Sequence, residues 1–332
     1  MIGAFAAKLP LATPGELRAN GVLGLNRRNL HYVQGENRRA LYPLVDDKRQ
    51  TKRLLESSGV ATPKLLGVIE GERDADSCLQ RMADAGEGFV VKPAKGSAGK
   101  GVTVIEEVLA NRRGRILFRT AGGDLLSLSQ LRHHLSNILS GVYSFGDRRD
   151  SAVVEEVVHP APPFTEIVWE GIPDIRIVVM RGYPVMAMGR LPTLESDGRG
   201  NLHQGAVGVG IRIADGAFAG GQHKNRFISE HPDTLRPLDG YTVPDWGKML
   251  RLAARCTDLV GLGFLGVDIV VDRERGPLIL ELNARPGVSI QLANRCGLEA
   301  RLAKAEAWAE AGDAEDAEPA DARVARAQAG FA

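Results

Sequence analysis

The chain has 332 residues, and its 42 Lys and Arg residues against 41 Asp and Glu residues give a formal net charge of +1. This balance argues against a polybasic nucleic-acid-binding protein, and an aromatic content of 5% argues against a base-stacking surface. Hydrophobic residues make up 44% of the chain and charged residues 25%, which is typical of a globular protein with a sizeable core. At this length we expect two subdomains that share a cleft.

The cysteines and the N-terminal segment indicate the compartment. Cys78, Cys256 and Cys296 lie far apart with no CxxC spacing, so we expect free thiols rather than disulfides or a cysteine-based zinc site. The opening apolar stretch is interrupted by Lys8 and Pro10, too early for a signal peptide. No apolar run approaches the ~20 residues that a membrane helix needs. We therefore expect a cytoplasmic protein with neither a membrane nor a nucleic-acid partner.

The sequence patterns of the first half of the chain predict few helices or strands before residue 46, and alternating helices and strands after it. Residues 1–45 are rich in Arg and Asn, and only a short helix over 14–20 is expected there. Asp46 is the expected N-cap of a helix that ends at Gly59. The patterns that follow predict a strand over 64–70, a helix over 75–85, a strand over 88–92, a glycine-rich loop over 96–101 and a strand over 102–106.

The second half predicts a helix over 125–140, strands over 152–158, 174–181 and 183–190, a polar loop over 195–210, a helix over 245–260, and a hairpin of 266–272 with 277–283. Beyond residue 302 the Ala, Glu, Asp and Arg content predicts a frayed helix or a disordered tail. Strands and helices mix with hairpins and without strict βαβ alternation. The pattern therefore predicts an α+β architecture.

The predicted hairpin, GVDIVVDRERGPLILELNARPG, places three oxygen-bearing side chains together. If Val271 pairs with Leu278, then Asp268 lies opposite Glu281. Asn283 follows Glu281 by two residues and so lies on the same face of the sheet. Two carboxylates and an amide are suitable ligands for Mg²⁺ or Mn²⁺.

A second interpretation of this hairpin remains open. Unpaired carboxylates on a buried strand would be costly, but arginines can pair with them as well as a metal ion can. Arg176 and Arg285 are the candidate partners of Asp268 and Glu281. The matching positions of the three side chains favour the metal.

A glycine-rich segment, FVVKPAKGSAGKGV, follows Lys92 at the end of an apolar strand. Its small residues allow backbone N–H groups to approach phosphate oxygens, and its lysines supply positive charge. It is not a P-loop, since the GxxxxGK[ST] order is absent. The GLGFLG sequence at 261–266 follows a helix and leads into a strand, the reverse of a dinucleotide-binding unit. A flexible surface loop is the alternative for 96–101, but combined with the acidic hairpin the loop predicts a nucleoside triphosphate site.

These pieces resemble the ATP-grasp superfamily of carboxylate–amine ligases, from Asp46 to about Asn294. The resemblance implies an ATP-grasp fold in which two α+β subdomains enclose a nucleotide cleft. The ATP-binding residues that it implies are Lys48 in DDK, with Lys52 left open as its alternative, Lys92 in GFVVKP, the loop residues Gly96, Ser97, Gly99 and Gly101, and Glu155 and Val157 in VVEEVV, whose backbone would meet adenine. It also implies Arg176 in DIR as a catalytic residue at the phosphates, and Asp268, Glu281 and Asn283 as magnesium ligands.

Within the superfamily, the chain is similar to α-L-glutamate ligase-like proteins, including the ribosomal-protein glutamate ligase branch. The stretch GRGNLHQGA resembles a loop of that branch and implies that Arg199, Asn201 and His203 lie near the triphosphate and the acyl acceptor. An ordinary loop histidine is the alternative for His203. Arg285 stands where that branch has a small residue, and it could bind the γ-phosphate or a substrate carboxylate.

The resemblance implies an ATP-dependent ligase that forms an amide bond through an acyl phosphate and adds glutamate or a similar amino acid. The implied cofactors are ATP and two Mg²⁺ or Mn²⁺ ions. The implied partner is a small amino acid, a peptide or a protein C-terminus, and a homo-oligomer is compatible with such an enzyme. An ATP-grasp kinase and a non-catalytic nucleotide-binding protein are the alternatives.

The expected domain organisation follows from the same resemblance. It comprises a short N-terminal segment over 1–45 as the remnant of a preceding domain, an N-terminal ATP-grasp subdomain over 46–153, a C-terminal subdomain with the metal site over 154–300, and a tail over 301–332.

Overall fold

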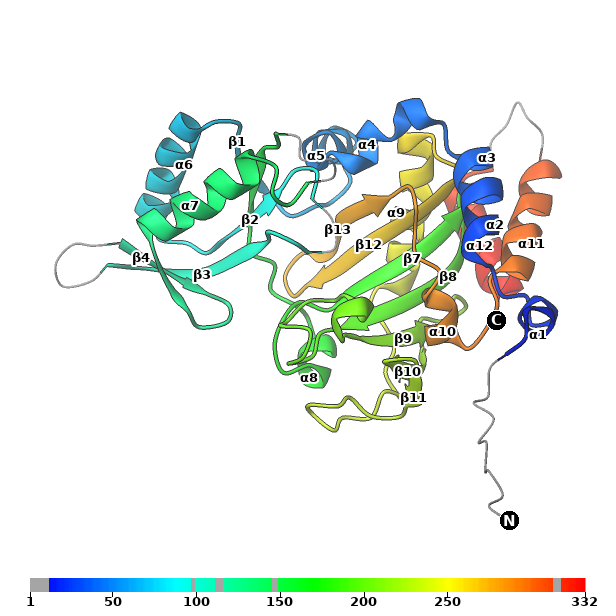
Figure 1. The fold of residues 1–332 in the computed structure, drawn as a ribbon. Helices are drawn as coiled ribbons and strands as arrows, with labels where there is room; N and C mark the ends of the chain where they lie inside the picture. Colours follow the sequence, from blue (N-terminus) through cyan, green and yellow to red (C-terminus); the bar gives the residue numbers. More distant parts are fainter. Residues whose placement is uncertain (1–11, 97–98, 111–115, 145–148, 313–317, 332) are drawn as a thin grey trace, which may run out of the picture.

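The computed structural model describes residues 12–96, 99–110, 116–144, 149–312 and 318–331. Within them, a six-stranded and a seven-stranded sheet, both antiparallel, lie side by side, each with its own helices (Figure 1). This arrangement confirms the predicted α+β fold with two subdomains. None of the described helices combines the length and the apolar character that a bilayer-spanning helix requires.

The smaller sheet has the strand order β1-β6-β2-β3-β4-β5. Its strands are β1 (Leu65–Ile69), β2 (Phe89–Pro93), β3 (Thr103–Ala110), β4 (Ile116–Thr120), β5 (Leu125–Ser127) and β6 (Ala152–Glu156). Two helices, α6 (Glu72–Ala85) and α7 (Leu128–Leu139), cover one of its faces and complete its core with Leu79, Leu131 and Leu135. The predicted boundary between residues 153 and 154 falls inside β6.

The larger sheet has the strand order β11-β10-β9-β8-β7-β12-β13. Its strands are β7 (Asp174–Met180), β8 (Tyr183–Leu191), β9 (Val207–Ile211), β10 (Phe218–His223), β11 (Arg226–Ile228), β12 (Phe264–Asp272) and β13 (Gly276–Asn283). The helices around it are α8 (Phe164–Ile167), α9 (Trp246–Val260), α10 (Ile290–Asn294), α11 (Glu299–Glu310) and α12 (Ala320–Gly330). Its core is the larger of the two, and it includes residues of the N-terminal segment.

The residues before the first sheet form a helical arm, which we define as residues 12–47. It comprises α1 (Pro14–Ala19), α2 (Leu25–Arg27), a π-helical segment (Arg28–Val33), α3 (Gln34–Glu36), a 3₁₀ turn (Arg39–Leu41) and α4 (Pro43–Asp46). The expectation of only one short helix in this segment was wrong. The π-helical segment breaks the 3.6-residue spacing by which sequence patterns reveal helices.

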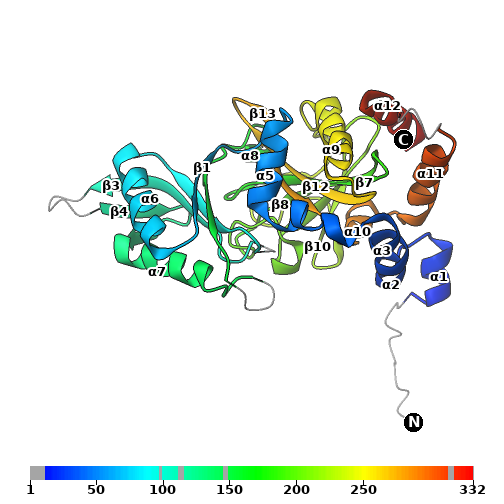
Figure 2. The same ribbon diagram turned by 90° about the horizontal axis from the view of Figure 1, so that it is seen from above.

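Helix α5 (Lys48–Ser57) lies over the junction between the two sheets (Figure 2). Its N-cap is Asp47, whose carboxylate accepts a hydrogen bond from the Arg49 amide at 3.0 Å. The predicted N-cap, Asp46, instead ends α4. The cap belongs to the residue with extended backbone, and the sequence DDK does not distinguish the two aspartates.

Of the two alternatives for the residues beyond 302, the disordered tail is wrong for the described residues, and the helical one differs in that α11 (299–310) and α12 (320–330) are packed rather than frayed. Val324 and Ala327 of α12 are buried, and Arg323 donates to the Asp258 carboxylate of α9 at 2.9 Å. Small alanines permit this close approach, although the same composition is typical of disordered tails.

The polar loop predicted over 195–210 contains the start of a strand, because β9 begins at Val207 and is buried. The two glycines of this strand, Gly208 and Gly210, are close-packing sites rather than loop residues. A Cβ added at Gly210 would lie 2.6 Å from the Ala293 carbonyl of α10. Residues 125–127, expected to be helical, form β5, with Ser127 as the N-cap of α7.

Asn37 ties the helical arm to the larger sheet. Its amide donates to the carbonyls of Phe264 (2.7 Å) and Ala284 (2.8 Å) and accepts from the Phe264 N–H (3.0 Å). The Asn37 side chain is buried, so the three backbone groups that it bonds lie away from water. Asn37 is therefore a buried polar contact that fixes the arm at the start of β12.

Replacing Asn37 by alanine should lower the free energy of unfolding by about 3 kcal/mol, because three buried backbone groups lose their partner. Urea denaturation measures this change. Asn20→Ala is the matched control, since the Asn20 amide bonds an exposed carbonyl and its loss should cost at most about 0.5 kcal/mol. Equal losses in the two variants would contradict the role given to Asn37.

Candidate functional site

The acidic hairpin β12–β13 pairs Asp268 with Glu281, as the sequence predicts. The register changes by one residue at a β-bulge next to this pair, and Leu278 therefore lies opposite Val270 rather than Val271. The predicted Val271–Leu278 pair is wrong for that reason. The functional pair keeps its place because it lies on the other side of the bulge.

Asp268 is at the centre of a buried charge cluster on three adjacent strands. Arg176 of β7 binds it through two hydrogen bonds of 2.7 and 2.6 Å, and Arg190 of β8 lies 2.8 Å away. Arg190 also donates to Asp174 at 2.7 Å. Burial alone would raise the pKa of Asp268, but the two guanidinium groups outweigh it and lower that pKa to about 2. Asp268 is therefore a carboxylate at neutral pH.

The hairpin acids have two interpretations, arginine pairing and metal binding. Asp268 does pair with an arginine, Arg176. Arg285 does not pair with either acid of the hairpin; it lies 2.8 Å from Asp46. Glu281 instead lies 3.2 Å from the Lys48 ammonium.

The three predicted metal ligands also gather on one face. The Asn283 amide donates to Asp268 at 3.2 Å, and Glu281 is half-buried beside it. The described residues contain no cluster of three His, Cys, Asp or Glu side chains, so a metal ion here would need the Asn283 amide oxygen as its third ligand. A half-turn of that amide presents its oxygen to the same space. The donor set fits a hard divalent cation that shares Asp268 with the arginines.

Lys48, the first residue of α5, joins the two halves of the site. Its ammonium donates to the Gly96 carbonyl of the glycine-rich loop at 2.8 Å and lies 3.2 Å from the Glu281 carboxylate. Its backbone N–H donates to the Ala94 carbonyl at 2.9 Å. The glycine-rich loop, helix α5 and the acidic hairpin therefore meet at the Lys48 ammonium.

Lys92 and Glu155 lie in a second buried charge cluster, inside the smaller sheet. The Glu155 carboxylate is 2.5 Å from the Lys92 ammonium and 2.9 Å from that of Lys52. Burial would raise the pKa of Glu155, but the attraction of Lys92 and Lys52 lowers it. Val157 follows the end of β6, where its backbone lies outside the ladder. Contacts of Glu155 and Val157 with adenine stay a prediction.

The sequence leaves open whether Lys48 or Lys52 contacts ATP, and it does not indicate Arg190. Lys52 lies one helical turn after Lys48, and this i, i+4 spacing places both on one face of α5. Arg190 carries no such signal, because its contact with Asp268 depends on the order of the strands in the sheet.

The glycine-rich loop approaches the GRGNLHQGA stretch, residues 198–206. A Cβ added at Gly99 would lie 3.5 Å from Cδ of Arg199. Asn201 caps a 3₁₀ turn (Leu202–Gln204) by accepting from the His203 N–H at 3.0 Å, and the His203 side chain is exposed.

Within the glycine-rich loop, Gly101 has φ +72°, and a Cβ there would overlap the Tyr143 ring at 2.5 Å, so glycine is required. Ser97 lies outside the described residues.

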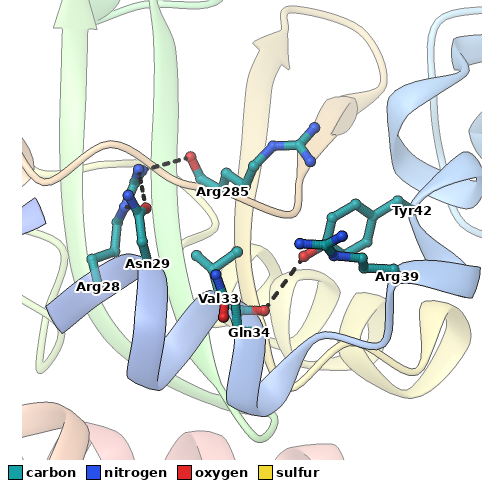
Figure 3. A pocket seen from close by; sticks show the side chains of 7 residues that line it. All are labelled: Arg28, Asn29, Val33, Gln34, Arg39, Tyr42 and Arg285. Atoms are coloured by element: carbon teal, nitrogen blue, oxygen red, sulfur yellow. Dashed lines mark hydrogen bonds between the residues drawn. The ribbon is translucent and has the colours of Figure 1, made fainter. Parts of the chain in front are cut away.

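A pocket of about 560 Å³ lies between the helical arm and the segment that follows β13 (Figure 3). Arg285 is part of its wall, with its guanidinium 4.9 Å from the Tyr42 ring centroid. The residues that line it are Arg28, Asn29, Val33, Gln34, Arg39, Tyr42 and Arg285. The sequence indicated Arg285 but not Arg28 or Arg39, although the Arg and Asn content of residues 26–39 was a signal.

Glu155→Gln should lower the free energy of unfolding by about 3 kcal/mol at pH 7, because two buried ammonium groups lose their carboxylate. Since the folded pKa of Glu155 is lowered, the difference from wild type should be full above the unfolded pKa of about 4.3 and shrink as the pH falls below it. Urea denaturation at several pH values measures this. Glu156→Gln is the control: Glu156 pairs with the exposed Arg275, and its loss should cost at most about 1 kcal/mol.

Comparison with solved structures finds ligases and a synthetase of low sequence identity. The chain is similar to ATP-grasp ligase PsnB in complex with a minimal precursor (13% identity, TM-score 0.44, 81% of this chain and 61% of that chain). It is also similar to the D-cycloserine synthetase DcsG (16% identity, TM-score 0.45, 82% of this chain and 71% of that chain). A third similar structure is the D-alanine–D-alanine ligase of Coxiella burnetii (12% identity, TM-score 0.46, 88% of this chain and 61% of that chain). The chain thus spans about three fifths of the PsnB chain.

The comparison with curated proteins finds no match. Among family models, the one for sugar-transfer associated ATP-grasp matches residues 27–307. The match covers both sheets, the two charge clusters and all but the first part of the helical arm. The ATP-grasp superfamily inferred from the sequence motifs is thereby confirmed, and the chain belongs to the sugar-transfer associated ATP-grasp family.

Proposed function

We propose that this protein is an ATP-dependent carboxylate–amine ligase. The observation that carries the proposal is the position of Lys48, which contacts both the glycine-rich loop and the acidic hairpin. A triphosphate between these two segments would meet backbone N–H groups and lysines on one side and the hairpin carboxylates on the other. The negative charge of the triphosphate would therefore be matched on the loop side. On the hairpin side it would meet carboxylates, so a cation is needed between them.

The proposed reaction needs no side-chain nucleophile. A substrate carboxylate oxygen attacks the γ-phosphorus, the bond to the β-phosphate oxygen breaks, and ADP leaves. An amine nitrogen then attacks the carbonyl carbon of the acyl phosphate, the C–O bond breaks, phosphate leaves and the amine gives up a proton. The contribution of the protein is alignment and stabilisation of negative charge.

Charged residues of this chain have distinct places in that scheme. Lys48, which lies in the cleft, and Lys92, at the end of β2, would hold phosphate oxygens, while the buried Lys52 holds Glu155 in position. Arg176 would bring its positive charge to the developing phosphoryl group. Asn201 and His203 would donate to the same oxygens from the neighbouring loop.

Asp268, Glu281 and Asn283 would hold the divalent cation, Mg²⁺ or Mn²⁺, as one ion or two. When bound, the cation would neutralise charge on the transferred phosphoryl group. Gly99 of the glycine-rich loop lies near Arg199. A loop closed over this end of the site would exclude water from an acyl phosphate. The transfer of glutamate, rather than another amino acid, rests on the family resemblance alone.

The protein incubated with Mg·ATP and pooled amino acids and peptides should release ADP and phosphate and form an amide product that mass spectrometry identifies. A stable phosphorylated product without an amide would instead indicate a kinase. Binding of Mg·ATP in isothermal titration with no turnover across the panel would indicate a nucleotide-binding protein without catalysis.

Glu281→Gln should reduce Mg-dependent ADP release at least about 100-fold, because it removes a charged ligand from the cation. Glu274→Gln, in the exposed turn of the same hairpin, is the control and should retain full activity. Unchanged unfolding midpoints would show that both variants fold. Full activity of Glu281→Gln would remove the metal assignment.

A further inference from the structure

The pocket between the helical arm and the segment after β13 is lined by three arginines, Arg28, Arg39 and Arg285. The arm supplies two of them and the turn after Asn283 supplies the third. Side chains of Asn29, Gln34 and Tyr42 add uncharged polar groups to the wall (Figure 3). The cavity, about 560 Å³, is large enough for a small organic molecule.

The positive charge of this pocket is not balanced within the described residues. Arg28 donates to uncharged acceptors, namely the carbonyls of Arg285 (3.1 Å) and Pro286 (3.0 Å) and the Asn29 amide oxygen. Arg39 forms no ion pair with another described residue, whereas Arg285 pairs with Asp46. Burial, together with repulsion by Arg285, lowers the pKa of Arg28. Of the three guanidinium groups, only that of Arg285 has a carboxylate partner among the described residues, and an anion in the pocket would therefore be stabilised.

The pocket adjoins the proposed ATP site through covalent and hydrogen-bonded neighbours. Arg285 is two residues from Asn283, and Arg28 holds this turn by donating to the carbonyls of Arg285 and Pro286. On the other side, Asp46 precedes the N-cap of α5, where Lys48 meets Glu281. A molecule in the pocket would thus lie beside the segments that carry the metal ligands and the first lysine.

We propose that the pocket formed by Arg28, Arg39 and Arg285 binds an oxyanion of the non-nucleotide substrate, so that this ligase acts on a substrate with an anionic group besides the carboxylate that reacts. The proposal rests on the proposed ligase function. Planar guanidinium groups bind carboxylate and phosphate oxygens in pairs, so both anions have the required chemistry. A neutral amino acid would leave the pocket charge unbalanced.

Direct binding tests this proposal without turnover. Isothermal titration of the full chain compares L-glutamate with L-glutamine and O-phosphoserine with serine, two pairs that differ in the anionic group. At least one anionic member should bind tenfold or more tightly than its neutral counterpart, and the better of the two shows whether carboxylate or phosphate is preferred. Equal binding within both pairs, or no binding of any of the four, would overturn the proposal.

Arg39→Gln should abolish the preference for the anionic member, because Arg39 holds no other described side chain. Arg38→Gln is the matched control: Arg38 is an exposed neighbour that does not line the pocket, and its variant should bind like wild type. Unfolding midpoints check that both variants fold. A preference that survives Arg39→Gln and Arg28→Gln alike would overturn the assignment of the pocket.

A separate titration of Mg·ATP distinguishes failure of the pocket from failure of the ligase proposal. Wild type and Arg39→Gln should bind Mg·ATP equally, since Arg39 lies outside the proposed nucleotide contacts. Loss of the anion preference with retained Mg·ATP binding supports the pocket. An absence of Mg·ATP binding in wild type would reject the ligase proposal, whatever the anion titration shows.

Discussion

The Lys48 ammonium holds together segments that are far apart in the chain. Its contacts with the Gly96 carbonyl and the Glu281 carboxylate join the glycine-rich loop of one sheet to the acidic hairpin of the other. The side chain is only 14% exposed, so water competes weakly for these contacts. The Asp47 cap begins α5 at this lysine and thereby sets where the cation lies. The geometry of the cleft depends on this one charge and on the cap before it.

Two buried charge clusters lie near that contact, one with two lysines around a single carboxylate and the other with two arginines and two carboxylates. In one, Glu155 holds Lys92 and Lys52 inside the smaller sheet; in the other, Asp268 holds Arg176 beside the hairpin. Buried ion pairs contribute little net stability, because desolvation offsets much of the attraction. Their value in this fold is positional. They keep flexible cationic side chains in fixed positions, which the proposed reaction would use to stabilise phosphate charge.

The helical arm gives this chain a feature that the two sheets alone would not have. Asn37 fixes the arm at the edge of β12, and Tyr32 packs its ring 5.5 Å from that of Phe264. The arm therefore reaches the segment that follows β13 and adds Arg28 and Arg39 to the wall that already contains Arg285. A short segment before the first lysine is in this way sufficient to build a charged pocket beside the cleft.

The sequence by itself determined the α+β class and the convergence of Asp268, Glu281 and Asn283, because the two-residue period of a strand places alternate side chains on one face. It also indicated Lys48 through a local motif. The tertiary structure alone decided that Arg190 contacts Asp268 and that Arg28 meets the turn after β13, because these contacts depend on strand order and on how the arm packs. The bulge beside Asp268 and the π-helical segment of the arm escaped prediction for a related reason: each adds a residue to a regular repeat, and surrounding packing rather than local preference stabilises it.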